Sequence, residues 1–242
     1  MFVHYGQSIM SLGRMKETFA AKIISFNKEL NFSKELYKGI QVLNPFKDNA
    51  EILDIMDSFY RKFYNDTNKR KLIVGINPGR LGAGVTGIPF TDTKRLTEIC
   101  NISIDSVSSH EPSSVFVYEV IEAYGGVERF YGDFFINSMS PLGFIQQNTK
   151  GNWVNCNYYD YPQLFEQTKP FIISNLKKQI AMGVDTSNCI VLGKKNAKYL
   201  KSINTKEKLF DSITVLDHPR YIVQYKSKEK DKYLTEYLKA LS

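Results

Sequence analysis

Three side chains in this sequence stand where apolar runs end, and their types could do chemistry together. Asn77, Asn137 and His218 each lie at or just beyond the end of a short apolar segment of the kind that forms a buried strand. An amide both donates and accepts hydrogen bonds, and an imidazole can donate, accept or transfer a proton. Because the carboxyl ends of parallel strands meet at one edge of a sheet, we expect these three side chains to converge on a single site.

The first of the three lies in a glycine-rich loop. Residues 75–90 read GINPGRLGAGVTGIPF, and five glycines with two prolines exclude the interior of a helix or strand. Such a loop brings backbone atoms close to a ligand at the end of a strand. The GxxxxGK[ST] pattern of a P-loop is absent, and no acidic residue follows a second strand at the distance expected for a dinucleotide site. A nucleotide-binding transferase that holds phosphates in this loop remains one alternative.

Apolar runs that read as strands alternate with segments that read as helices. The expected strands are 71–76, 134–136, 189–192 and 213–216. The expected helices are 16–30, 48–64, 91–100, 113–124, 163–182, a short one ending at 200, and 226–241. Loops are expected at 42–46, 101–112 and 145–162, the last rich in Asn and Tyr and long enough to be functional or mobile. This alternation predicts an α/β protein with three α/β/α layers around a central, mostly parallel four-stranded sheet.

Composition bounds the kind of protein. The chain has 242 residues, of which 43% are hydrophobic, and this supports one domain over residues 1–242, with residues 1–15 as a disordered tail. No apolar run approaches the roughly 20 residues of a membrane span. The start of the chain lacks the pattern of a secretory signal. The sequence therefore predicts no membrane partner.

Cysteine, histidine and charge usage narrow the function further. Cys100, Cys156 and Cys189 lie far apart without a CxxC pair, and the three histidines form no metal-ligand pattern. We expect no bound metal, no cofactor, no disulfide framework and a location in the reducing cytoplasm. The net charge of +7 suits a polyanionic partner such as nucleic acid.

Three motifs carry a family resemblance. The segment GINPGRLGAGVTGIPF at 75–90 resembles, without gaps, the first motif of the single-strand-selective monofunctional uracil-DNA glycosylases, GMNPGPFGMxQTGVPFG. FFINSMSPLGF at 134–144 is similar to the family's strand with Asn before Cys-Pro-Leu, and VLDHPR at 215–220 is similar to its His-Pro-Ser-Pro motif. The motifs occur in the family's order, over about residues 71–225.

The resemblance implies a reaction and two catalytic residues. A member of this family hydrolyses the N-glycosidic bond of uracil, including 5-substituted uracils, in DNA and leaves an abasic site for base-excision repair. By this resemblance Asn77 positions the attacking water. A neutral His218 donates a hydrogen bond to the charge that develops on uracil O2.

The resemblance also assigns the walls of a base pocket. Phe90 is expected to stack on the uracil. The Asn137 amide can match uracil O4 and N3–H while mismatching cytosine. The other substrate-binding positions carried over are Gly75, Ile76, Gly79 and Gly87, with backbone amides near Gly79 and Gly87 as further donors.

The segment after His218 is expected to contact DNA, although the second proline of the family's motif is missing there. The candidates for a wedge and for phosphate contacts are Arg220, Tyr221, Ile222, Gln224 and Lys226, with Lys194 and Lys195 after the third strand. The predicted partner is uracil-containing DNA, single- or double-stranded, and we expect a monomer. The second class of function left open is a catalytically weak or inactive glycosylase-like protein that only binds DNA.

Overall fold

A four-stranded parallel sheet forms the centre of the protein, as the sequence predicts. The computed structural model describes residues 16–242, so the predicted tail at 1–15 lies outside the described residues. The strands run in the order β3-β2-β6-β7, and each neighbouring pair is parallel. Their bounds are β2 (Arg70–Gly75), β3 (Phe134–Ser138), β6 (Val184–Leu192) and β7 (Ser212–Leu216).

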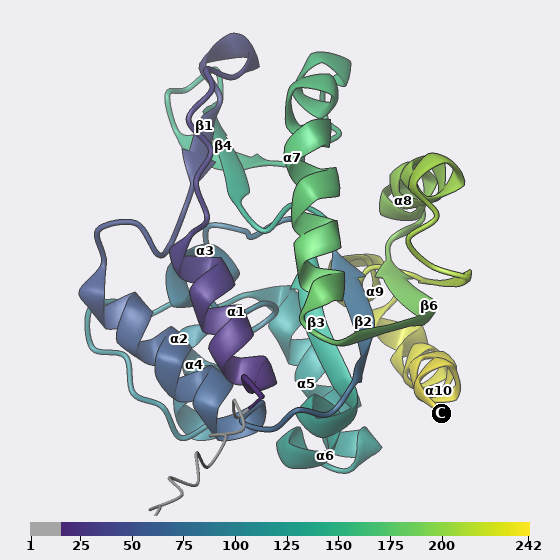
Figure 1. Ribbon diagram of the computed structural model, residues 1–242. Helices are drawn as coiled ribbons and strands as arrows, with labels where there is room; N and C mark the ends of the chain where they lie inside the picture. The colour runs from purple at the N-terminus through teal and green to yellow at the C-terminus, as the bar shows by residue number, and fades with distance from the viewer. Residues whose placement is uncertain (1–15) are drawn as a thin grey trace, which may run out of the picture.

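Helices cover both faces of this sheet, which gives the predicted three layers (Figure 1). On one face lie α1 (Phe19–Lys28), α7 (Pro162–Ala181) and α8 (Lys194–Glu207), and on the other lie α5 (Pro112–Tyr124) and α10 (Lys230–Leu241). In the described part of the chain, no helix has the length and apolar character needed to cross a membrane.

Successive side chains of one strand serve the two layers. Phe135 is fully buried and meets the ring of Phe19 in α1 edge to face, with centroids 5.3 Å apart. The next residue, Ile136, points to the opposite face and shares an apolar niche with Val117 of α5 and Leu241 of α10. This alternation follows from the period of two in a strand, and it explains why a short run of apolar residues builds the core on both sides.

A second, smaller sheet corrects the prediction of two loops. It has the antiparallel order β1-β4-β5 and consists of β1 (Gln41–Leu43), β4 (Gly143–Gln147) and β5 (Trp153–Cys156). Phe144 pairs with Val42 on one side and with Cys156 on the other. The Asn-rich composition reads locally as a loop, but pairing with a strand a hundred residues away overrides that preference. The predicted loops at 42–46 and 145–162 are therefore wrong in these parts.

Shorter helices lie in the connections between the larger elements. They are α3 (Ala83–Thr86) inside the glycine-rich loop, α4 (Thr93–Glu98), α6 (Val127–Asp133) and α9 (Pro219–Tyr225), while α2 (Ala50–Phe63) packs on α1. The C-terminal helix was predicted from 226. It begins at Lys230, because α9 and a short 3₁₀ turn at Ser227–Glu229 occupy the preceding residues.

Candidate active site

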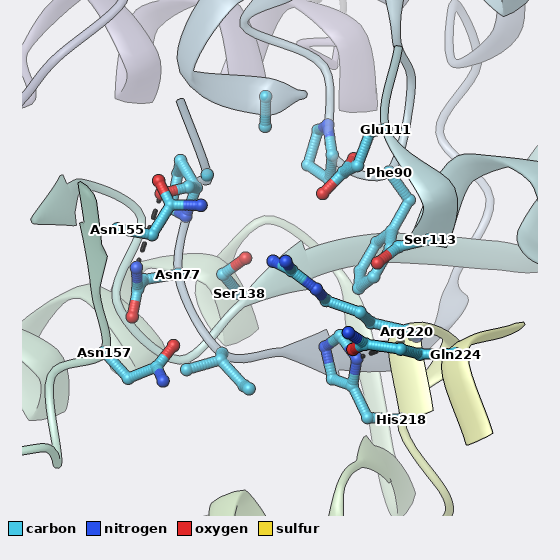
Figure 2. Close-up of a pocket in the computed structure, with 15 residues that line it drawn as sticks. Asn77, Phe90, Glu111, Ser113, Ser138, Asn155, Asn157, His218, Arg220 and Gln224 are labelled. Atoms are coloured by element: carbon cyan, nitrogen blue, oxygen red, sulfur yellow. Dashed lines mark hydrogen bonds between the residues drawn. The ribbon is translucent and has the colours of Figure 1, made fainter. Parts of the chain in front are cut away.

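The predicted convergence of strand ends produces a pocket of about 380 Å³ at the carboxyl edge of the sheet. Figure 2 shows Asn77, Asn155 and Asn157 along one side of it, and Phe90, Glu111 and Ser113 along the other. The predicted site residues that line it are Ile76, Asn77, Gly79, Phe90, His218, Arg220 and Gln224. Lining residues that the sequence did not assign to the site are Pro78, Ala83, Pro89, Glu111, Ser113, Ser138, Asn155 and Asn157.

The side chain of Asn77 is held in one orientation. Its Oδ1 accepts a hydrogen bond of 3.1 Å from the backbone N–H of Tyr158, and its Nδ2 donates to the carbonyl of Cys156 at 3.3 Å. A backbone N–H can only donate, so the oxygen must face Tyr158. An amide oxygen accepts two hydrogen bonds, so Oδ1 keeps one lone pair for a further donor. Such an atom can accept a hydrogen from a water molecule in the pocket.

A buried amide ties the neighbours of Asn77 to the sheet. Asn196 of α8 is fully buried, and its Nδ2 donates to the carbonyls of Gly75 at 3.0 Å and Leu192 at 3.2 Å. Its Oδ1 accepts the hydroxyl of Tyr158 at 2.7 Å. The chain of contacts from the ends of β2 and β6 through Tyr158 therefore reaches the backbone N–H that holds Asn77.

His218 presents a neutral donor to the pocket. It is the N-cap of α9, and its Nδ1 accepts the backbone N–H of Arg220 at 3.2 Å. With Nδ1 as acceptor, the proton of the neutral ring is on Nε2. Burial lowers the pKa of His218 to about 4, and the nearby Arg220 charge acts in the same direction. The ring is therefore neutral at pH 7, and Nε2–H is free to donate.

Phe90 forms the apolar wall beside His218, with the two ring centroids 5.9 Å apart. A Cβ at Gly75 would lie 2.8 Å from two atoms of the Phe90 ring, so only glycine leaves room for the ring at the end of β2. Phe90 has a φ of 54°, a left-handed conformation that costs a non-glycine residue roughly 1–3 kcal/mol. The surrounding loop holds this conformation, and the ring is thereby aimed at the pocket.

Three predicted substrate-binding residues, Gly75, Gly87 and Asn137, do not line the pocket. The amide of Gly87 closes α3 by donating to the carbonyl of Ala83 at 2.9 Å, so it is not available to a base. Asn137 is buried on β3, where its Oδ1 accepts the N–H of Ser138 at 2.8 Å. Because successive residues of a strand point to opposite faces, Ser138 rather than Asn137 lines the pocket. Gly75 acts indirectly, by giving Phe90 its space.

The predicted DNA-contacting residues also separate into groups. Arg220 and Gln224 of α9 line the pocket, and the Tyr221 ring is 41% exposed on the same helix. Ile222 is fully buried, so its assignment to a wedge is wrong. The lysines already have acidic partners, because Lys226 pairs with Glu229, Lys194 with Asp217, and Lys195 with Asp160.

Several lining residues come from segments that the sequence placed in loops. Asn155 lies in β5, where its Oδ1 accepts the N–H of Arg80 at 2.9 Å, and Asn157 follows that strand. The signal that could have found them was the Asn-rich composition of 145–162. Glu111 and Ser113 come from the start of α5, where the sequence gave no signal of a site. Within residues 16–242, no group of three or more His, Cys, Asp or Glu side chains could hold a metal ion.

We predict that Gly75→Ala lowers turnover by roughly 10- to 100-fold while the protein still folds, because the added methyl displaces the Phe90 ring from the pocket wall. Single-turnover kinetics and circular dichroism would measure both effects. Gly132→Ala is the matched control, since a Cβ there meets nothing within 4 Å. Unchanged turnover in Gly75→Ala would show that the position of Phe90 does not matter.

We predict that Tyr158→Phe costs about 1–3 kcal/mol of unfolding free energy, because it leaves the buried Oδ1 of Asn196 without its donor. Turnover should fall only modestly, since the backbone N–H that holds Asn77 remains. Urea denaturation gives the first quantity and a kinetic assay the second. Tyr225→Phe, on an exposed ring, should leave stability unchanged. Equal stability of the two variants would contradict the role of this hydroxyl.

Comparison with known proteins identifies the family of this chain. The family model of the uracil DNA glycosylase superfamily matches residues 61–242. A crystal structure of Pedobacter heparinus SMUG2 is similar, with 48% sequence identity and a TM-score of 0.90 over 92% of this chain and 96% of that one. Among curated protein sequences no match is found. The chain therefore belongs to the uracil-DNA glycosylase superfamily, in the single-strand-selective monofunctional family that its three motifs indicate.

Proposed function

We propose that this pocket removes uracil from DNA by hydrolysing the N-glycosidic bond, leaving an abasic site for repair. Membership of the superfamily supports the reaction, and the arrangement of Asn77, Phe90 and His218 around one pocket is the observation that supports these residue roles. A duplex buries its bases, so the target nucleotide must be extruded into the pocket or come from a single strand. The DNA-binding protein without activity, left open by the sequence, is not favoured.

We assign to Asn77 the role of positioning the attacking water. An amide is not a strong base at neutral pH, so its contribution is position rather than proton abstraction. Its Oδ1, fixed by the Tyr158 N–H, has one remaining lone pair that can accept a hydrogen from water. A water held in this way is oriented toward the sugar C1′ once the base begins to leave. Such preorganisation lowers the barrier because the group does not have to reorient during the reaction.

We assign to His218 the role of stabilising the departing uracil. As the C1′–N1 bond breaks, its electron pair moves onto the uracil ring and negative charge develops on O2. The neutral Nε2–H of His218 can donate a hydrogen bond to that oxygen, since Nδ1 is already occupied by the N–H of Arg220. A ring whose pKa lies near 4 stays in this donor form across the neutral range.

The base is held between an apolar and a polar wall. Phe90 offers its ring for stacking, beside His218. For the polar edge we propose Ser138, whose hydroxyl lines the pocket and can both donate and accept. Asn137 then supports Ser138 through the hydrogen bond to its N–H, in place of the base-reading role predicted from sequence.

Helix α9 is proposed as the DNA-contacting element at the pocket mouth. Tyr221 and Tyr225 are 41% and 68% exposed, and their rings lie 5.7 Å apart. Exposed aromatic rings stack on unpaired bases, and Arg220 beside them can contact phosphate. This surface suits single-stranded or locally opened DNA. A monomeric state and a cytoplasmic location remain predictions, the latter consistent with three free, buried cysteines.

The proposed function predicts strand breakage at uracil. An oligonucleotide with one deoxyuridine, treated with the enzyme and then with alkali, should break at that site. Asn77→Ala should slow the release by roughly 100-fold or more, the scale of losing one positioned catalytic group. Asn152→Ala, in an exposed turn, is the control. Absence of breakage with single- and double-stranded substrates alike would rule out the proposed reaction, and near-normal turnover of Asn77→Ala would reject its role.

The two neighbouring residues of β3 can be told apart by kinetics. We predict that Ser138→Ala lowers kcat/KM for deoxyuridine by about tenfold, the scale of one lost hydrogen bond. Asn137→Ala should mainly lower stability, because it removes the acceptor for the Ser138 N–H. Measurement of kcat/KM and of urea denaturation on both variants separates the cases. Loss of uracil selectivity in Asn137→Ala alone would return the base-reading role to Asn137.

A further inference from the structure

Glu111 is a carboxyl side chain in the pocket wall that the roles above do not use. It is the N-cap residue of α5 but makes no side-chain capping bond. Figure 2 shows its carboxyl group pointing into the pocket, on the same side as Phe90. Its Oε2 is buried without a hydrogen-bond partner in the described residues. A buried polar atom without a partner is costly, so its presence in a substrate pocket needs a reason.

The glycine-rich loop packs directly on this carboxyl. A Cβ at Gly82 would overlap Oε2, whereas Oε1 lies 3.8 Å from the Cβ position of the pocket residue Gly79. Oε2 is therefore enclosed between α5 and the loop, and Oε1 is the atom nearer the pocket. No backbone N–H of the loop donates to either oxygen among the described residues. In the part of the chain that the structure describes, Oε2 therefore lacks the direct hydrogen bonds that usually stabilise an ionised carboxylate.

The charges around Glu111 act in both directions. Asp92 is buried at the start of α4, and its Oδ2 accepts the backbone N–H of Glu111 at 3.0 Å. That carboxylate is itself held by Arg95 at 3.2 Å and lies 3.4 Å from His110. Across the pocket Arg220 is the facing cation, and the other titratable group there is the neutral His218. Burial, followed by Asp92, raises the pKa of Glu111 to about 7, and Arg220 opposes the rise.

Binding of DNA shifts this balance toward the acid. An arginine at the pocket mouth is drawn to phosphate, and a base in the pocket removes the water around Glu111. Both changes disfavour the carboxylate. The reaction has the same preference, because a negative Glu111 would repel the charge that develops on the departing uracil.

We propose that Glu111 acts in its neutral form, as a donor whose O–H on Oε1 hydrogen-bonds a carbonyl oxygen of the extruded base. This assignment rests on the proposed glycosylase reaction. It gives the pocket a second neutral donor besides His218, on the wall formed by α5 and the glycine-rich loop. The hydrogen bond strengthens as negative charge moves onto the base. Ionisation of Glu111 removes the donor and adds a repelling charge, so the ionised enzyme is the inactive form.

The test is the pH dependence of kcat/KM for uracil release between pH 6 and 8.5, measured with a single-stranded substrate far below saturation, because this quantity reports the protonation of the free enzyme. The wild-type rate should fall by roughly tenfold from pH 6 to pH 8, as one proton is lost. Glu111→Gln keeps a neutral donor at this position, so its rate at pH 6 should stay within a few-fold of wild type and should not fall at pH 8. Glu98→Gln, on an exposed side chain of α4, is the matched control and should keep the wild-type profile.

The outcomes are distinct. A wild-type enzyme that releases no uracil at any pH would overturn the proposed function and this assignment with it. An active wild type whose rate does not fall, or a Glu111→Gln variant that keeps the same fall, would overturn the assignment alone. Glu111→Ala separates a donor from a spacer, because it should be slower than Glu111→Gln at every pH. Circular dichroism at pH 6 and 8 confirms that each variant is folded, and equal rates for the Ala and Gln variants would show that no donor is needed.

Discussion

The missing side chain of Gly75 is the constraint on which the site depends. The ring of Phe90 packs so closely on the end of β2 that a Cβ at position 75 would collide with it. This contact fixes the far end of the glycine-rich loop against the sheet and brings the ring next to His218. The left-handed backbone of Phe90 is held by buried Thr86, whose hydroxyl donates to the carbonyl of Thr91 at 2.6 Å. One close approach thus joins strand, loop and the start of α9.

The polar side of the pocket is prepared before any DNA arrives. Asn196 donates hydrogen bonds to backbone carbonyls at the ends of two strands and accepts one from the Tyr158 hydroxyl. The backbone N–H of Tyr158 in turn donates to Asn77. Each member of the chain has defined donors and acceptors, so the amide of Asn77 cannot rotate without losing a hydrogen bond. Catalysis by position requires such rigidity, because a water that is displaced by an ångström loses much of its advantage.

The pocket of this uracil-DNA glycosylase combines neutral donors with an exposed cation, Arg220. His218 is neutral because burial lowers its pKa to about 4. Burial raises the pKa of Glu111 to about 7, which also favours an uncharged side chain. Desolvation shifts a base and an acid in opposite directions, yet both shifts favour the form without charge. Such a site suits a reaction in which negative charge appears on the leaving base. The exposed Arg220 side chain can bind the phosphate backbone of DNA.

The sequence by itself determined the parallel sheet and the convergence of Asn77, Phe90 and His218, because apolar strands, glycine turns and the family motifs are local signals. The tertiary structure decided that Ser138 and not Asn137 faces the pocket. Successive residues of a strand point in opposite directions, so a shift of one residue changes which side chain faces the pocket. The tertiary structure also decided the sheet that brings Asn155 to the site and the place of Glu111, because both depend on contacts between segments distant along the chain. Local composition contains no information about such partners.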